Sequence, residues 1–205
     1  MKIFFISVIS CVFSSNVFPS VTASATAASD YVWRGQTQSS HGASNQVSME
    51  YGHGNFKVGS WVATLGGSNG SEVDLYAGYS HAFQAEGYSL DFMVTNYTYT
   101  ENSAGNAVEY SIGLNTPYLN LFIGQMPEYF GVESASNYIS ISKDFILGDS
   151  GIALGLGVGS TSFADEDKFS ENEDGYQDYK VSLTKKKDDI EISIFYTEND
   201  LEEDE

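Results

Sequence analysis

The chain has 205 residues, with 28 acidic and 9 basic side chains and a formal charge of −19. This balance excludes nucleic acid as a partner, because affinity for nucleic acid depends on Lys and Arg side chains that neutralise phosphates. The single cysteine, Cys11, lies near the N-terminus. An internal disulfide and a cysteine-based metal site are therefore not expected.

The first 23 residues are typical of a secretory signal peptide. Lys2 precedes an apolar run from Ile3 to Phe13, and small residues follow near position 23, where a signal peptidase could cut. The apolar run is too short for a membrane-spanning helix, which needs about 20 residues. We therefore expect a signal peptide at residues 1–23 and one domain at residues 24–205.

Beyond residue 24, apolar residues alternate with polar or small ones. In "QVSMEY" (46–51), Val47, Met49 and Tyr51 fall on one face, because successive side chains of a strand point to opposite sides. Eleven segments follow this pattern and predict strands: 26–34, 45–52, 55–64, 72–83, 88–100, 107–116, 118–126, 135–146, 151–162, 176–185 and 190–197. Most are near the nine to eleven residues that a tilted strand needs to cross a bilayer.

The connections between these segments alternate in length. Short turns such as "HGN" (53–55) and "KKDD" (186–189) alternate with longer polar stretches such as 35–44 and 127–134. Outer-membrane barrels have this organisation, with short periplasmic turns and longer outside loops. We therefore predict an all-β protein, an antiparallel up-and-down transmembrane β-barrel of about 12 strands, 11 of them in this chain. A secreted soluble β-protein is the weaker alternative.

Several segments resemble a known family. The stretch "SDYVWRGQTQSS" (29–40) is followed, in order, by "GSWVATL" (59–65), "EVDLYAGY" (72–79), "LDFMVTNYTY" (90–99) and "NAVEYSIGL" (106–114). Together they resemble the TorF-like porin family of small proteobacterial outer-membrane proteins. The resemblance implies an outer-membrane location, insertion by the barrel assembly machinery and passive diffusion of small solutes. Such proteins usually end in a strand with a terminal aromatic residue, whereas this chain ends "LEEDE". We therefore expect that a twelfth strand is missing.

If the apolar side chains of each strand face lipid, the residues that alternate with them face the lumen. Carboxylates outnumber cations there, so an open lumen would favour cations. Equally, the charges of a narrow barrel could pair with one another and plug it. Arg34 is expected to be a salt-bridge partner that holds the first strand, rather than a selectivity residue. The predicted lumen-lining residues are Asp30, Arg34, Glu50, Lys57, Asp74, Asp91, Glu109, Asp144, Asp178, Lys180 and Glu191.

No sequence motif points to catalysis, a cofactor or a metal. His41, His53 and His81 are scattered, and "GLGVG" (155–159) lacks both the spacing and the following helix of a phosphate loop. The chain is therefore predicted not to be an enzyme and to need no cofactor.

Two functions remain. The first is a narrow, cation-preferring diffusion pore in the outer membrane. The second is a non-conducting barrel whose outside loops, "QTQSSHGAS" (36–44) and the acidic loop 164–175, bind a ligand, a partner or the divalent ions that bridge lipopolysaccharide. Both require contact with outer-membrane lipid and lipopolysaccharide, and the sequence leaves the oligomeric state open.

Overall fold

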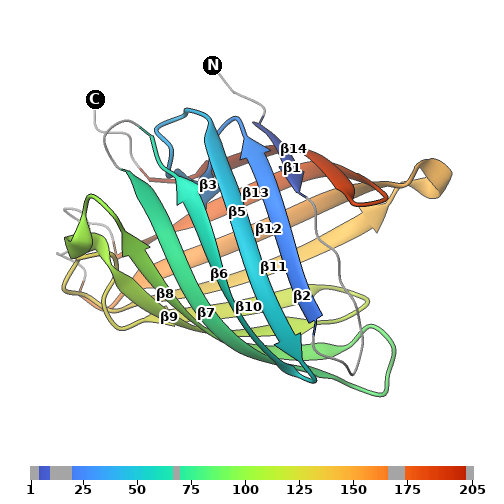
Figure 1. Ribbon diagram of the computed structural model, residues 1–205, viewed down its shortest axis with the longest axis horizontal. Helices are drawn as coiled ribbons and strands as arrows, with labels where there is room; N and C mark the ends of the chain where they lie inside the picture. Colours follow the sequence, from blue (N-terminus) through green and yellow to red (C-terminus); the bar gives the residue numbers. More distant parts are fainter. Residues whose placement is uncertain (1–4, 10–19, 67–69, 166–173, 202–205) are drawn as a thin grey trace.

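The computed structural model describes residues 5–9, 20–66, 70–165 and 174–201, and the described part of the chain is almost entirely β-structure. Eleven strands form one antiparallel sheet that curves round an interior (Figure 1). Short 3-10 turns occur at Ser103–Gly105 and Gly148–Ser150. Among the described residues, no helix is long and apolar enough to cross a membrane.

Ten of the eleven predicted strands are confirmed, and their ends agree with the prediction to within two residues. They form because β-branched and aromatic residues alternate with polar or small ones over lengths that suit a pleated sheet. These strands are β5 (Ser44–His53), β6 (Phe56–Thr64), β7 (Ser71–Ala82), β8 (Ser89–Tyr99), β9 (Ala107–Asn115), β10 (Asn120–Met126), β11 (Ser136–Ile146), β12 (Ile152–Phe163), β13 (Gly175–Lys187) and β14 (Ile190–Asn199).

The prediction of a first strand at 26–34 is wrong. The first strand of the eleven-strand sheet is β2 (Ser20–Ala28), which pairs with β5 along its whole length. Its sequence, "SVTASATAA", alternates only between small side chains, so the signal is weak. In the stretch that follows, aromatic Tyr31 and Trp33 alternate with charged Asp30 and Arg34 and so imitate the pattern of a strand. Those residues instead lie in a segment between β2 and β5 that contains only the two-residue strands β3 (Val32–Trp33) and β4 (Gln36–Thr37).

Neighbouring strands of the sheet are also neighbours in sequence, apart from the β3–β4 pair, which forms a small sheet of its own. Strand β1 (Phe5–Ile9) pairs with β14 over five residues and with β2 over two, so the ring of strands closes through β1. Both β1 and the first four residues of β2 lie within the expected signal peptide. Cleavage of that peptide stays a prediction.

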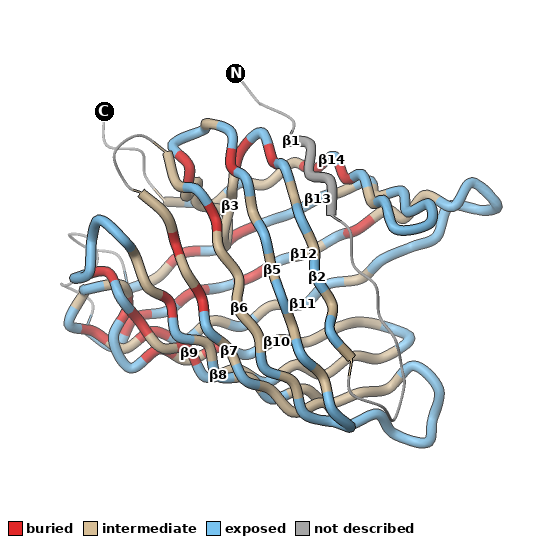
Figure 2. The backbone as a smooth tube through the Cα atoms, in the orientation of Figure 1, coloured by how far each residue is buried: buried red, intermediate tan, exposed pale blue. Residues whose placement is uncertain are grey.

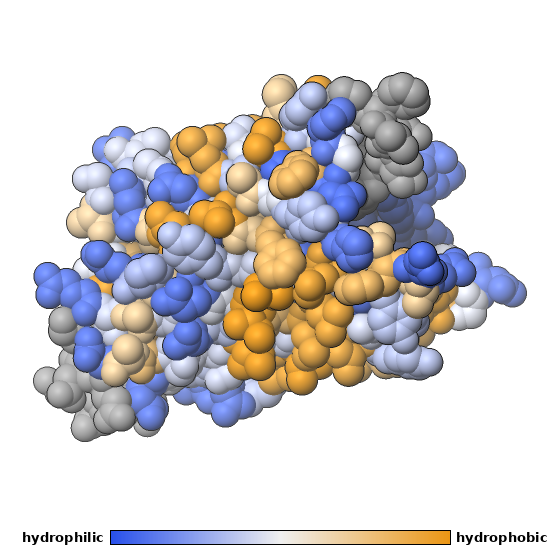
Figure 3. Space-filling view, turned by 90° about the horizontal axis from the view of Figure 1, so that it is seen from below, coloured by the Kyte–Doolittle hydropathy of each residue, from blue (hydrophilic) through white to orange (hydrophobic). Residues whose placement is uncertain are grey.

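The two faces of the sheet differ in character. Apolar side chains of the predicted rows point outward; Val47 is 54% exposed and Ile139 is 51% exposed. Carboxylates at the positions between these apolar residues point inward, and Glu72 is only 2% exposed. Strand register brings outward apolar residues together, as in the pair Ile141 and Val158. Figure 3 shows one outer face, where hydrophobic side chains gather into a continuous patch with hydrophilic residues towards the left-hand end.

The two ends of the sheet also differ. Tight connections such as 54–55 and 188–189 lie at one end, called here the short-turn end, and the segment 29–43 and the loop 127–135 lie at the other, the long-loop end. Figure 2 shows that most buried residues gather towards the long-loop end. A buried hydrophobic cluster is there and consists of Tyr97, Ala107, Met126, Tyr129, Phe163 and Tyr176. Among the described residues, the buried apolar side chains are therefore concentrated at the long-loop end of the interior.

Candidate functional site

The segment between β2 and β5, residues 29–43, folds into the interior and is called here the inner segment. Its tip is the turn between β3 and β4, where Arg34 and Gly35 have φ values of 47° and 76°. Two-residue hairpin turns require such positive φ values, which cost a non-glycine residue free energy. The tip lies against β13 and β14: Asn199 Nδ2 donates to the Gly35 carbonyl at 2.7 Å, and a Cβ on Gly35 would lie 3.0 Å from the Cβ of Asp178.

Asp30 organises the base of the inner segment. Its carboxylate accepts hydrogen bonds from the hydroxyls of Thr37 (2.6 Å) and Ser39 (2.8 Å), and His41 Nδ1 lies 2.9 Å from its second oxygen. Asp30 itself is only 1% exposed. The Ser39 hydroxyl also accepts a hydrogen bond from the Tyr31 amide. This arrangement explains the order of residues in "SDYVWRGQTQSSH", because the Asp needs hydroxyls seven and nine positions later.

Arg34 extends from the tip across the interior to the opposite strands. Its guanidinium forms an ion pair with Glu109 on β9, and both side chains are buried. The guanidinium also lies 4.0 Å from the Trp33 ring centroid and 3.9 Å from that of Tyr138 on β11. Aromatic faces attract cations in such positions, and burial strengthens the attraction. The ion pair expected for Arg34 is thus present, but Arg34 lies on the inner segment rather than on a first strand.

A glycine makes room for this ion pair. Gly124 on β10 points inward, and a Cβ there would lie 2.8 Å from Glu109 Oε2 and 3.0 Å from Arg34 Nη2. Those distances are too short for a real methyl group. A side chain at position 124 would therefore displace Glu109 or Arg34.

A second buried acidic pair lies beside the base of the inner segment. Glu72 and Asp74 follow each other on the inner face of β7 and are 2% and 8% exposed. The Tyr31 hydroxyl is 3.5 Å from Glu72 Oε1, and the Tyr31 ring packs edge-on against Trp61 at 5.3 Å. Burial, and then the charge of Glu72, raise the pKa of Tyr31 well above its usual value. The Tyr31 phenol therefore stays protonated.

Other predicted lining residues lie in the half of the interior nearer the short-turn end, and the structure does not bring them together. The Tyr76 hydroxyl donates to Glu50 at 3.2 Å, and Asp91 accepts from Asn115 Nδ2 at 2.7 Å. The Lys57 side chain lies against Gly78. In the middle of the sheet, Asp178 lies 3.4 Å from the Tyr138 hydroxyl, and Lys180 Nζ is 4.7 Å from the Phe195 ring centroid. Asp144 is exposed and Glu191 is half-buried, both near the short-turn end.

Two cavities lie next to the inner segment and share no lining residue. The outer one, of about 330 Å³, is lined by Trp33 and the loops of the long-loop end. The inner one, of about 150 Å³, is lined by Arg34, Gly35 and strand residues that include Tyr138 and Lys180. Trp33 lines the outer cavity and Arg34 lines the inner one, and the Arg34 guanidinium stacks on the Trp33 ring.

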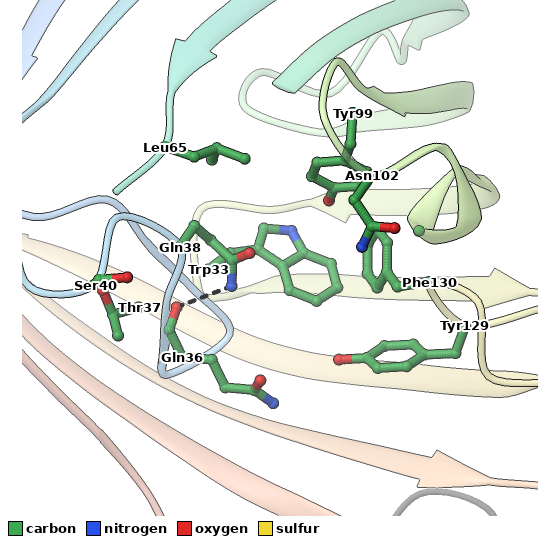
Figure 4. Close-up of a pocket in the computed structure, with 11 residues that line it drawn as sticks. Trp33, Gln36, Thr37, Gln38, Ser40, Leu65, Tyr99, Asn102, Tyr129 and Phe130 are labelled. Carbon is green, nitrogen blue, oxygen red and sulfur yellow. Dashed lines mark hydrogen bonds between the residues drawn. The ribbon is translucent and has the colours of Figure 1, made fainter. Parts of the chain in front are cut away.

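The outer cavity has an aromatic and a polar part (Figure 4). Trp33 lies in the middle; Tyr99, Tyr129 and Phe130 lie on one side of it and Gln38 on the other. Phe130 packs edge-on against Trp33 at 5.3 Å. Burial raises the pKa of the Tyr129 phenol well above its usual value, so that its hydroxyl stays protonated. The lining consists of Trp33, Gln36, Thr37, Gln38, Ser40, Leu65, Tyr99, Asn102, Gly105, Tyr129 and Phe130, none of which is charged.

Within the described residues, no three His, Cys, Asp or Glu side chains form a group that could hold a metal ion. Most of the acidic loop 164–175, one candidate for binding divalent ions, lies outside the described residues, as does Cys11. Sequence reasoning missed Glu72, although its parity matches that of Asp74. It also missed the aromatic lining of the outer cavity, for which the sequence gives no periodic signal because its residues come from four separate parts of the chain.

Comparison with known proteins places this chain in a family. A model of a family described as "bacterial protein of unknown function (Gcw_chp)" matches residues 15–205. No curated protein and no solved structure matches the chain. The family description does not refer to TorF-like porins, so that resemblance stays a prediction. The matched region includes the inner segment and all eleven strands of the main sheet, and the chain therefore belongs to the Gcw_chp family of bacterial proteins.

Proposed function

We propose that the protein is an outer-membrane β-barrel whose acidic lumen is closed at its long-loop end by the inner segment. The observation that carries the proposal is the exposure of apolar rows on one face of the sheet and the burial of carboxylates on the other. A soluble sheet would bury the apolar face, because exposed apolar patches of this extent are rare on soluble monomers. A barrel in lipid has the opposite arrangement.

The outer surface supports a membrane location in more detail. Towards the long-loop end, outward positions are polar, as at Asn96 and Gln177, whereas Phe92 and Val181 on the same strands are apolar and exposed. An apolar hollow on this surface is lined by Phe92, Ile112 and Ile123, among others. The polar zone would lie outside the bilayer. The expected signal peptide and the resemblance to TorF-like porins support the same location.

The interior supports a closed rather than an open lumen. The inner segment, the Arg34–Glu109 ion pair and the aromatic cluster occupy the long-loop end, whereas the half nearer the short-turn end contains half-buried Asp91 and exposed Asp144. The wild-type protein is therefore expected to conduct poorly. Cations would pass preferentially once the inner segment moves, because carboxylates outnumber cations on the inner face. A permanently open pore is the competing possibility, and it would conduct without any such movement.

The location is tested by expressing the full chain in a Gram-negative host, followed by fractionation and a gel of boiled and unboiled outer membranes. A barrel is expected in the outer-membrane fraction, with different mobilities before and after boiling. A matched control replaces outward Ile139 and Ile141 by Lys, since a lysine on the lipid face costs about 2–4 kcal/mol near the midplane. The control should fail to insert. A wild-type protein that is soluble in the periplasm would contradict the proposal.

A further inference from the structure

The outer cavity lies on the side of the Trp33–Arg34 stack that faces the long loops, and its chemistry suits a particular class of ligand. We propose that it binds a neutral saccharide of one or two sugar units. The inference goes beyond the proposed function and does not depend on whether the lumen conducts.

The size of the cavity limits the ligand. Its volume of about 330 Å³ is at the small end of the range, roughly 300–1,000 Å³, of sites that hold small molecules. The inner segment forms its floor through Trp33, and loops from three other parts of the chain form its walls. One or two sugar rings would fit in a cavity of this volume.

The absence of charge in the lining argues for a neutral ligand. Each lining side chain is aromatic, aliphatic, an amide or a hydroxyl, or is the hydrogen of Gly105. Two charged residues of the inner segment lie close by but do not line the cavity. Arg34 pairs with Glu109. Asp30 accepts hydrogen bonds from Thr37 and Ser39. An ionic ligand would lose its hydration without gaining a counter-charge, which is costly.

The division of the lining into an aromatic and a polar part favours a sugar among neutral ligands. A sugar ring has C–H faces that pack on aromatic rings and hydroxyls that both donate and accept hydrogen bonds. Side-chain amides also donate and accept, so Gln38 and Asn102 match the hydroxyls. In Figure 4 the Asn102 amide lies above Phe130, while Gln38 approaches Trp33 from the other side and donates to the Gln36 carbonyl at 3.2 Å. A ligand on Trp33 would thus have an amide within reach at each end.

Tryptophan fluorescence gives a direct test, because the chain has only two Trp residues, Trp33 and Trp61. In the full-length Trp61→Phe protein, refolded in detergent, only Trp33 emits. The probes are glucose, N-acetylglucosamine and maltose, with glucuronate, which keeps the sugar ring, as a charged analogue of glucose. At least one neutral probe should shift the Trp33 emission saturably, with a dissociation constant of about 1 mM or lower. Glucuronate should bind at least about tenfold more weakly than glucose.

Variants of the amides show whether binding uses this cavity. Gln38→Leu and Asn102→Leu should each raise the dissociation constant at least about tenfold, the factor that corresponds to 1.4 kcal/mol. Asn137→Leu, which changes an exposed outward amide on β11, should leave it unchanged. A heat-modifiability gel on every sample shows that each variant is folded. Folded protein that responds to none of the neutral probes, or binding that is unchanged in both amide variants, would overturn the proposal.

Discussion

The guanidinium of Arg34 bonds to the carboxylate of Glu109, 75 residues later in the chain, across the interior of the sheet. This contact joins the tip of the inner segment to β9, while Gly35 contacts β13 and β14. Because β9 and β14 are five strands apart in the sheet, the two contacts together span the interior. The inner segment is thus fixed on opposite sides.

Removing the Glu109 charge should loosen the inner segment. Glu109→Gln leaves a buried guanidinium without its counter-charge, which typically costs about 3–5 kcal/mol. Urea unfolding of the protein in lipid vesicles should show a loss within or just below that range. The double variant Arg34→Met with Glu109→Leu should lose less than Glu109→Gln, because it leaves no unpaired charge. Glu50→Gln, which changes a half-buried carboxylate with one phenol partner, is the control and should change stability by under about 1 kcal/mol.

A side chain at Gly124 should lower the stability of the protein more than a side chain at Gly113. Gly124→Ala forces a methyl group against Glu109 and Arg34, and overpacking of this kind costs about 1–3 kcal/mol. Gly113→Ala is a matched control on the neighbouring strand, because its Cβ would meet nothing closer than 3.7 Å. The control should be close to neutral in the same unfolding measurement. Equal losses for the two variants would show that the ion pair does not need the glycine.

The hydrogen bonds of Asp30 should limit how often the inner segment leaves the interior. Arg34 is the only arginine in the chain, so an arginine-specific protease can cut at this one position. Asp30→Ala removes acceptors for Thr37 and Ser39, and hydrogen bonds to charged groups contribute about 1.5–3 kcal/mol each. Cleavage of the folded protein should therefore speed up at least about tenfold. Asp149→Asn, an exposed change in a turn at the short-turn end, is the control. A rate that is unchanged by Asp30→Ala would mean that other contacts hold the segment.

The N-terminus of the membrane-inserted protein is a further prediction. Cleavage near residue 23 would remove β1, through which the ring closes, and the first residues of β2. Mass spectrometry of the purified outer-membrane protein should find a chain that begins near Ser24. Strands β14 and β2 would then need another partner, because an unpaired strand edge in lipid is costly. Intact Met1 in that fraction would contradict the expected signal peptide.

The sheet was largely predictable from the sequence because the alternation between its faces is strong. In β12, Leu156 and Val158 alternate with Gly155 and Gly157, and such contrasts set both the face and the approximate strand ends. The inner segment was not predictable, since "SDYVWRG" alternates like a strand while the true strand before it consists of small residues. The alternating pattern of β9 predicted that Glu109 lies on the inner face. Its pairing with Arg34 was not predictable, because it depends on strand register and on the fold of a loop.

The outer cavity was even less predictable from the sequence than the inner segment. Its residues, such as Trp33, Leu65, Asn102 and Phe130, come from four connections that meet only when the sheet curves. Aromatic residues also favour strands and membrane interfaces, so their presence alone does not predict a site.

The most direct test of the account compares single-channel conductance of two proteins in planar bilayers. One is the wild type, and the other has residues 31–41 replaced by a short Gly-Ser linker that keeps β2 and β5 connected. We predict little or no conductance for the wild type and discrete, cation-selective openings for the variant. Equal conductance of the two proteins would show that the inner segment does not close the lumen. An inserted, heat-modifiable variant that stays silent would contradict the presence of a pore beneath the segment.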